Sequence, residues 1–229
     1  MHLTRLLLNP RSADVRRDLS NAHNMHRRVM TAFPDESVGD GARHKHAVLF
    51  RIDEARGDMH VLVQSATQPD WSRLPAGYLL ETFEPNPAQA DLSAQLSSLR
   101  QGQTLRFRLR ANPTKRVGKS NEALKGKRVE VVGVDRCLNW LARKQVVAGF
   151  TLAKSGVGSA ESYDVRVTEE PKVRGIRAGK PVIFGSVLFD GHLVVTEPDA
   201  FRTAMVQGLG TAKAYGFGLL SVGRAVHTS

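Results

Sequence analysis

The sequence predicts an α+β protein made of two tandem domains, each a split β-α-β unit. Segments with strand and helix periodicity follow in the order strand, helix, strand, strand, helix, and this order occurs twice along the chain. The length of 229 residues suits two domains of about 100 residues each. An apolar content of 41% is sufficient for a buried core. We therefore expect domains at 1–100 and 101–229.

The N-terminal domain begins with a short apolar stretch and a long segment of helical periodicity. This segment ends at the proline of "FPDE", and the turn-rich "DEARGD" separates two runs that predict a β-hairpin. "NPAQADLSAQLSSL" has a helical start and leucines at helical spacing. In chain order, the predicted elements are strand 2–9, helix 12–33, strands 44–52, 59–66 and 77–85, and helix 86–99.

The C-terminal domain opens with a regular strand pattern. Leu105, Phe107 and Leu109 alternate with three arginines, and a period of two puts those arginines on one face of a strand. Further on, Pro198 and an acidic cluster begin a helix that a glycine ends. The predicted elements are strand 103–116, helix 135–149, strands 149–154, 162–168 and 180–195, helix 197–208 and strand 218–225.

The net charge of +11 is concentrated in the middle of the chain. Residues 101–182 hold 18 basic and 7 acidic residues, whereas residues 1–100 hold 12 of each and residues 183–229 hold 3 of each. A basic cluster is typical of a protein that binds nucleic acid; the alternatives are a solubility charge or an acidic protein partner. The candidate phosphate-binding residues in this region are Arg108, Arg110, Lys115, Arg116, Lys127, Arg128, Lys172, Arg174 and Arg177.

Several classes of protein are excluded by what the sequence lacks. Cys137 is the single cysteine, which excludes an internal disulfide and a multi-cysteine zinc site. His44 and His46 alternate on a predicted strand, but no partner set completes a tetrahedral metal site. The N-terminal segment is too short for a signal peptide, and the longest apolar run, 182–189, is too short to span a bilayer. We expect a cytoplasmic protein with no metal, no cofactor and no membrane contact.

The stretch "NAHNMHRRVMTAFP" places His23 and His26 three residues apart, on one face of a helix. Two imidazoles with an ordinary pKa near ~6.5 can divide proton removal and proton donation, as RNA cleavage through the ribose 2′-hydroxyl requires. Arg27 is a candidate to stabilise the charge that develops on the phosphate. If the helix ran unbroken through the whole segment, His26 would instead be a core histidine on its apolar stripe. Ser20 and Asn21 favour a break before it.

The stretch "QGLGTAKAYGFGLLS" holds four glycines around one lysine. Gly208, Gly210, Gly216 and Gly218 permit positive φ angles and exposed amides that can cradle a phosphate, and Lys213 adds a positive charge. The pattern fits neither a Walker loop nor a dinucleotide fingerprint, because it leads into a strand at the end of the chain. The alternative is a helix C-cap followed by a tight turn.

Four stretches together resemble the signature segments of the CasE family, the CRISPR RNA-processing endoribonucleases of the type I-E Cascade complex. They occur in the family's order along the whole chain: "NAHNMHRRVMTAFP", "HVLVQSATQPDW", "LRFRLRANPTKR" and "QGLGTAKAYGFGLLS". The resemblance implies two tandem ferredoxin-like domains of the RRM-like, RAMP type. It also implies metal-independent cleavage of CRISPR repeat RNA at the 3′ base of its stem-loop by 2′-hydroxyl attack.

The resemblance also implies partners and residue roles. The enzyme stays bound to the repeat stem-loop and joins the other Cascade subunits, and the glycine-rich segment helps to shape the RNA-binding surface. The family's catalytic histidine matches His26, whereas the family's common tyrosine three residues earlier is His23 here. Either His23 acts as base or acid in its place, or His26 acts with electrostatic help alone. The alternative function is a non-catalytic RNA-hairpin-binding subunit of the same complex.

Overall fold

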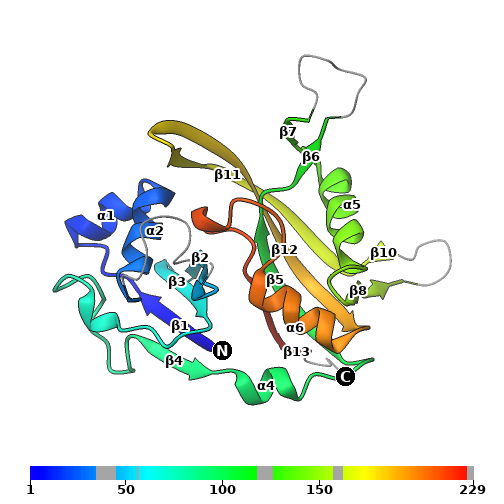
Figure 1. Ribbon diagram of the computed structural model, residues 1–229, viewed down its shortest axis with the longest axis horizontal. Helices are drawn as coiled ribbons and strands as arrows, with labels where there is room; N and C mark the ends of the chain where they lie inside the picture. Colours follow the sequence, from blue (N-terminus) through cyan, green and yellow to red (C-terminus); the bar gives the residue numbers. More distant parts are fainter. Residues whose placement is uncertain (35–44, 56, 118–125, 157–161, 226–229) are drawn as a thin grey trace. The chain divides into compact units, whose positions relative to one another are not determined.

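The computed structural model describes residues 1–34, 45–55, 57–117, 126–156 and 162–225 (Figure 1). The chain forms two compact units. Unit 1 contains Met1–Ser98, Val173–Ile183 and Ala212–Leu219, and unit 2 contains Leu99–Lys172, Phe184–Thr211 and Leu220–Ser229. The predicted domains followed the chain continuously, whereas two short C-terminal segments belong to unit 1. The glycine-rich stretch is therefore divided: its first glycines belong to unit 2 and its last ones to unit 1.

Unit 1 is built on an antiparallel sheet in the order β2-β3-β1-β4. Its strands are β1 (His2–Leu7), β2 (Leu49–Ala55), β3 (Asp58–Ser65) and β4 (Ala88–Asp91). The first strand lies in the interior of the sheet, where His2 is opposite both Ser65 of β3 and Asp91 of β4. The two strands that follow the helices form the β2-β3 hairpin. This arrangement is the split β-α-β topology of ferredoxin-like domains.

The predicted helix 12–33 is two helices, α1 (Ala13–Leu19) and α2 (Ala22–Met30). The break lies at Ser20 and Asn21, as expected. Ser20 ends α1, and the Asn21 side chain accepts a hydrogen bond of 2.9 Å from the backbone N–H of His23. After the break, α2 packs on the core through Ala22, Met25 and Val29, and His26 beside them is half-buried.

The core of unit 1 lies between these helices and the sheet. Trp71 enters it from the 3-10 helix η1 (Trp71–Arg73), and its indole N–H donates to Thr4 at 3.2 Å. Burial of each large apolar side chain is worth about 1.5–3 kcal/mol. The members include Leu6, Leu8, Val15, Met25, Val29, Phe33, Phe50, Val61, Val63, Trp71 and Tyr78.

Unit 2 repeats the same topology, which confirms the predicted α+β fold with two ferredoxin-like domains. Its sheet has the order β11-β12-β5-β13, and β8 also pairs with β12. On β5, Leu105, Phe107 and Leu109 are buried and the arginines between them lie on the other face, as predicted. The strands and helices are β5 (Thr104–Ala111), α5 (Val134–Gln145), β8 (Phe150–Leu152), β11 (Val165–Arg177), β12 (Lys180–Val195), α6 (Pro198–Gln207) and β13 (Leu220–Arg224).

Short elements complete the described chain. One antiparallel ribbon pairs β6 with β7, and another pairs β9 with β10. They are β6 (Thr114–Arg116), β7 (Arg128–Glu130), β9 (Lys154–Ser155), β10 (Ser162–Tyr163), α4 (Ser93–Ser97) and the 3-10 helix η4 (Lys213–Tyr215). No helix in the described part of the chain is long and apolar enough to cross a bilayer.

Two predicted elements of the N-terminal domain are wrong. Residues 77–85 form no strand in the described chain, because the side chain of Asn86 takes the place of a strand neighbour. It accepts from the backbone N–H of Leu7 and donates to the carbonyls of Leu7 and Leu80. The predicted helix 86–99 begins as β4, and only Ser93–Ser97 is helical.

One predicted strand of the C-terminal domain is divided. The run 103–116 forms β5 and then β6, with Asn112 and Pro113 between them. Proline has no backbone N–H to donate to a sheet, so a continuous strand is interrupted there. The division separates the arginines of β5 from Lys115 and Arg116 on the ribbon.

Candidate functional site

The predicted histidine pair lies on α2 of unit 1. His23 and His26 are both half-buried, and their spacing of three residues places their Cβ atoms about 5–6 Å apart on one face. His23 is in the first turn of α2, which contains no acidic residue. The amide groups at a helix N-terminus attract anions. The end of the helix that carries His23 therefore favours a nearby phosphate.

The imidazole of His26 is supported by an aromatic ring of β2. It stacks on Phe50 with ring centroids 6.3 Å apart and an angle of 17° between the rings. Phe50 is only 1% exposed, so its ring is held by the core. The Nδ1 atom of His26 is buried, although the residue as a whole is half exposed. This support limits the positions that the imidazole can take, which a proton-transfer group requires.

The last part of the glycine-rich segment packs on the same aromatic ring. Gly216 has a φ of +85°, and a Cβ at this position would lie 3.2 Å from Cε2 of Phe50. The preceding 3-10 helix η4 contacts both α2 and β2. Its Tyr215 hydroxyl donates to the carbonyl of Ile176 at 2.8 Å. Lys213 thus lies on an element that packs directly against the helix of His26.

Arg51, the neighbour of Phe50, holds the other end of this segment. Its side chain is 3% exposed, and its Nε lies 2.8 Å and 2.9 Å from the two carboxylate oxygens of Asp53. Its Nη1 donates to the carbonyl of Leu219 at 3.3 Å. Strand β2 therefore fixes residues 216–219 through both an aromatic ring and a buried guanidinium group.

The other glycines have structural roles in the described chain. Gly208 ends α6, and its N–H donates to the carbonyl of Ala204 at 2.8 Å, as the C-cap interpretation expected. Gly210 has a φ of +86°, and a Cβ there would lie 3.2 Å from the ring of Trp140. Gly218 has a φ of +88°. Phosphate contact by the amides of this segment stays a prediction.

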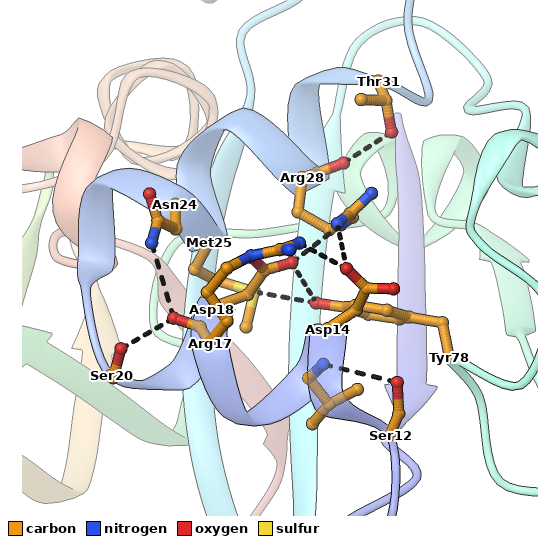
Figure 2. A network of polar contacts seen from close by, with 11 residues as sticks. Ser12, Asp14, Arg17, Asp18, Ser20, Asn24, Met25, Arg28, Thr31 and Tyr78 are labelled. Atoms are coloured by element: carbon orange, nitrogen blue, oxygen red, sulfur yellow. Dashed lines mark hydrogen bonds and ion pairs between the residues drawn. The ribbon is translucent and has the colours of Figure 1, made fainter.

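A buried polar network joins α1, α2 and the loop of Tyr78 (Figure 2). Asp18 is 3% exposed, and its Oδ2 accepts from Nε of Arg28 at 2.7 Å and from the hydroxyl of Tyr78 at 3.2 Å. The guanidinium of Arg28 also lies 5.1 Å from the centroid of the Tyr78 ring. Burial, followed by the Asp18 carboxylate, raises the pKa of Tyr78, so the phenol stays protonated and donates. The network fixes α2 relative to α1.

Four predicted phosphate-binding residues lie together on the β6-β7 ribbon of unit 2. Arg116 is directly opposite Arg128, while Lys115 and Lys127 flank them. All four side chains are exposed. None of the four forms an ion pair with an acidic residue in the described ranges, so their charges are available to a polyanion.

Arg108 and Arg110 differ from this pattern. Arg108 lies 2.6 Å and 3.2 Å from the carboxylate of Asp190, and Arg110 makes two bonds of 2.7 Å to Glu170. These fork-shaped pairs balance both arginine charges inside unit 2. The contacts favour a structural role for both residues over contact with phosphate.

The remaining basic candidates are dispersed. Lys172 is paired with Glu130 at 2.8 Å. Arg174 is exposed on the part of β11 that belongs to unit 1, and the side chain of Arg177 lies outside the described residues. Arg27 is exposed on α2 and lines a hollow between α1 and α2. In the described ranges, no three His, Cys, Asp or Glu side chains are placed to hold a metal ion.

A family model described as "CRISPR associated protein" matches residues 1–224. The chain belongs to this family. One relative of this CRISPR-associated protein is the CRISPR-associated endoribonuclease Cse3 of Thermus thermophilus, which is 38% identical over 97% of this chain and 99% of the relative. Another is the CRISPR system Cascade subunit CasE of Escherichia coli, 28% identical over 87% of this chain and 90% of the relative.

A solved structure extends the likeness to three dimensions. The CRISPR endoribonuclease Cse3 bound to a 19-nucleotide RNA superposes on this CRISPR-associated protein with a TM-score of 0.78. The two chains are 35% identical, and the match covers 97% of this chain and 100% of the other. The family resemblance read from the four sequence stretches is therefore confirmed.

Two features of the site could not be predicted from the sequence of this CRISPR-associated protein: the contact of Phe50 with His26 and the polar network around Asp18. Phe50 lies in an apolar strand and has the pattern of an ordinary core residue, so its contact with His26 could not be predicted. The partners of Asp18 are likewise distant in sequence, since Tyr78 is 60 residues away. The sequence indicated this network only through Asp18 itself, an acidic residue close to the apolar stripe of a predicted helix.

Proposed function

We propose that this CRISPR-associated protein is a metal-independent endoribonuclease. It cuts CRISPR repeat RNA at the 3′ base of the stem-loop and stays bound to the hairpin as a Cascade subunit, in the cytoplasm where the transcript is made. The observation that carries the proposal is His26, half exposed on α2 and stacked on the ring that Gly216 approaches. The likeness to an endoribonuclease over 97% of the chain supports RNA as the substrate.

The reaction needs one base and one acid. The ribose 2′-hydroxyl before the cut loses its proton to the base and attacks the phosphorus. The bond to the 5′-oxygen of the next nucleotide breaks, and the acid protonates that oxygen. The products are a 2′,3′-cyclic phosphate and a 5′-hydroxyl. We assign the two proton transfers to His26 and His23, because imidazoles on one helical face, with Cβ atoms about 5–6 Å apart, can flank a single phosphate.

The reaction also needs stabilisation of the negative charge that grows on the phosphate oxygens. Two sources of positive charge belong to the elements around the histidines in unit 1: the positive end of the α2 helix dipole, and Lys213 on η4, the element that packs against α2. Positive groups held in place before the reaction lower the barrier without further reorganisation. We assign Lys213 to this role.

Recognition of the hairpin falls to exposed basic side chains. The narrow major groove of an A-form stem excludes most side chains, so proteins read such stems by shape and phosphate contacts. The ribbon residues meet this requirement because they are exposed and carry no described acidic partner. The proposed stem contacts are Lys115, Arg116, Lys127, Arg128 and Arg174.

The proposal is tested by cleavage of labelled repeat RNA in the presence of EDTA. Wild type, His26→Ala and Lys213→Ala are compared, and an RNA with a 2′-deoxy substitution at the cut position serves as the matched substrate. We expect one cut below the stem by wild type, cleavage slower by at least about 10²-fold in His26→Ala, and no cut in the deoxy RNA. A cut in the deoxy RNA would exclude attack by the 2′-hydroxyl.

His23 favours one second candidate, a non-catalytic subunit that binds the same hairpin. A histidine stands where the related family commonly has a tyrosine, and a change at a reacting position can abolish the chemistry. In that case wild type binds the hairpin with strong salt dependence but yields no product. The same assay distinguishes the two candidates, because binding and cleavage are measured on one RNA.

A further inference from the structure

A hollow between α1 and α2 has no part in the proposed chemistry. Its volume is about 250 Å³, and it opens on the surface of unit 1 near the network in Figure 2. Arginines predominate in its lining, and its remaining side chains are polar or acidic. The lining residues are Arg17, Asp18, Asn24, Arg27, Arg28 and Thr31.

The charges around this hollow favour an anion. Residues 1–34 contain six arginines, two aspartates and no lysine or glutamate, although residues 1–100 as a whole are balanced. Both aspartates are already engaged: Asp14 bonds to Arg17, and Asp18 bonds to Arg28 at 2.7 Å. The side chain of Arg27, by contrast, is exposed and forms no hydrogen bond or ion pair with any described residue. An uncompensated guanidinium therefore stands at the rim of a concave basic surface.

The position of the hollow indicates which anion it takes. Arg27 directly follows His26 and lies about 100° further around α2, away from the buried stripe of that helix. An RNA cut at the base of its stem has a rigid duplex on one side of the cut bond and an unpaired strand on the other. With its side chains, a helix such as α2 is about 10–12 Å across. An RNA strand that passes from His26 to Arg27 must bend around this helix, which an unpaired strand can do and a rigid duplex cannot.

We infer that this hollow binds a phosphodiester of the single-stranded RNA that continues on the 3′ side of the cut bond. The inference rests on the proposed function. Arg27 is the main ligand, since its planar fork matches two phosphate oxygens. Arg17 forms the opposite wall, and Arg28 is a positioning residue that Asp18 and Tyr78 hold in place. The site secures the strand that leaves after cleavage and aligns the phosphate at His26.

The test compares two uncleavable RNAs with a 2′-deoxy nucleotide at the cut position. One ends at the cut, and the other continues with a short unpaired 3′ flank. We expect the flank to raise the affinity of wild type, and Arg27→Gln to remove this gain, about a five- to tenfold loss on the flanked RNA alone. The slope of log affinity against log salt falls by about 0.7 for that RNA, the value for one contact to a single strand.

Two further variants define the contact. Arg27→Lys retains a charge but not the fork, so it keeps part of the gain. Arg116→Gln, on the β6-β7 ribbon, is the matched control and weakens both RNAs equally. Arg27→Gln is expected to fold normally. The Arg27 side chain forms no hydrogen bond or ion pair with the residues that the structure describes, so the substitution breaks none.

Other outcomes overturn the inference. An equal loss on both RNAs would mean that Arg27 contacts the stem, and no loss on either would mean that the hollow binds something else, such as an acidic protein. The proposed function is judged separately, from cleavage of the ribose form. If wild type cuts that RNA and the flank adds no affinity, the inference alone fails.

Discussion

The packing of Gly216 on Phe50 can be tested by adding a single methyl group. Gly216 has φ and ψ of +85° and +22°, and an alanine in this left-handed conformation costs about 1–2 kcal/mol. The new Cβ would lie 3.2 Å from Cε2 of Phe50, so the ring must move by a few tenths of an ångström. Phe50 is buried and stacks on His26, and the displacement therefore reaches the imidazole. We expect Gly216→Ala to disturb both stability and chemistry.

Backbone strain sets the expected loss of Tm in Gly216→Ala, and displacement of the imidazole sets the expected loss of cleavage rate. Backbone strain of about 1–2 kcal/mol lowers Tm by about 2–8 °C for a chain of this size. A misplacement of 1 Å can cost about 10²-fold in rate, so a shift of a few tenths should slow single-turnover cleavage by about tenfold. Single-turnover conditions, with enzyme in excess, measure the chemical step apart from the slow release of product.

Gly57→Ala is the matched control. Gly57 has a φ of +84° in the turn between β2 and β3, and nothing lies within 4 Å of a Cβ at that position. We expect a similar loss of Tm with an unchanged cleavage rate. If Gly216→Ala cuts at the wild-type rate, or if Gly57→Ala slows cleavage equally, the contact between Gly216 and Phe50 is not what holds His26.

Three further predictions concern the histidines and the buried network. His26→Ala should slow cleavage by at least about 10²-fold while hairpin binding keeps its wild-type strength; a loss of binding instead would place His26 in recognition. His23→Tyr, which replaces the imidazole by a phenol with an ordinary pKa of about 10, should still cut but lose one limb of its pH–rate profile, and an unchanged profile would remove His23 from the proton transfers. Because the pKa of Tyr78 is raised above its ordinary value of 10.0, its contribution to stability is complete below pH 10 and is lost as the pH rises beyond it. Tyr78→Phe, which also lacks the bond to Asp18, should therefore be less stable by about 1.5–3 kcal/mol at neutral pH in urea denaturation and should lose less on going to alkaline pH. Equal alkaline losses would show that Tyr78 does not carry this dependence.

Local patterns determined several features correctly. The alternation on β5 placed Leu105, Phe107 and Leu109 in the core, because a strand directs successive side chains to opposite faces. The break between α1 and α2 followed from Ser20 and Asn21, since their side chains bond to nearby backbone groups. Such interactions join residues that are close in sequence, so they can be predicted from local periodicity and composition.

The strand predicted at residues 77–85 of unit 1 was wrong, and it shows the limit of local patterns. Residues 77–85 have strand-like composition, but Asn86 bonds to Leu7 of β1 and occupies the place of a neighbouring strand. The division of the chain into units could not be predicted from local patterns either. Residues 173–183 and 212–219 are far from the first hundred residues in the chain, yet they belong to unit 1 because of where they pack.

The sequence by itself determined the fold class, the repeated topology, the concentration of basic residues in the middle of the chain and the pair of histidines on one helix. Only the tertiary structure decided that Phe50 supports His26, that Gly216 approaches Phe50, and which arginines are compensated. Arg108 and Arg116 look alike in the sequence, but the register of β12 against β5 places Asp190 opposite Arg108, whereas Arg116 lies opposite Arg128. The physical reason is that periodicity fixes the direction of a side chain, while its partner is set by strand register and by packing between distant segments.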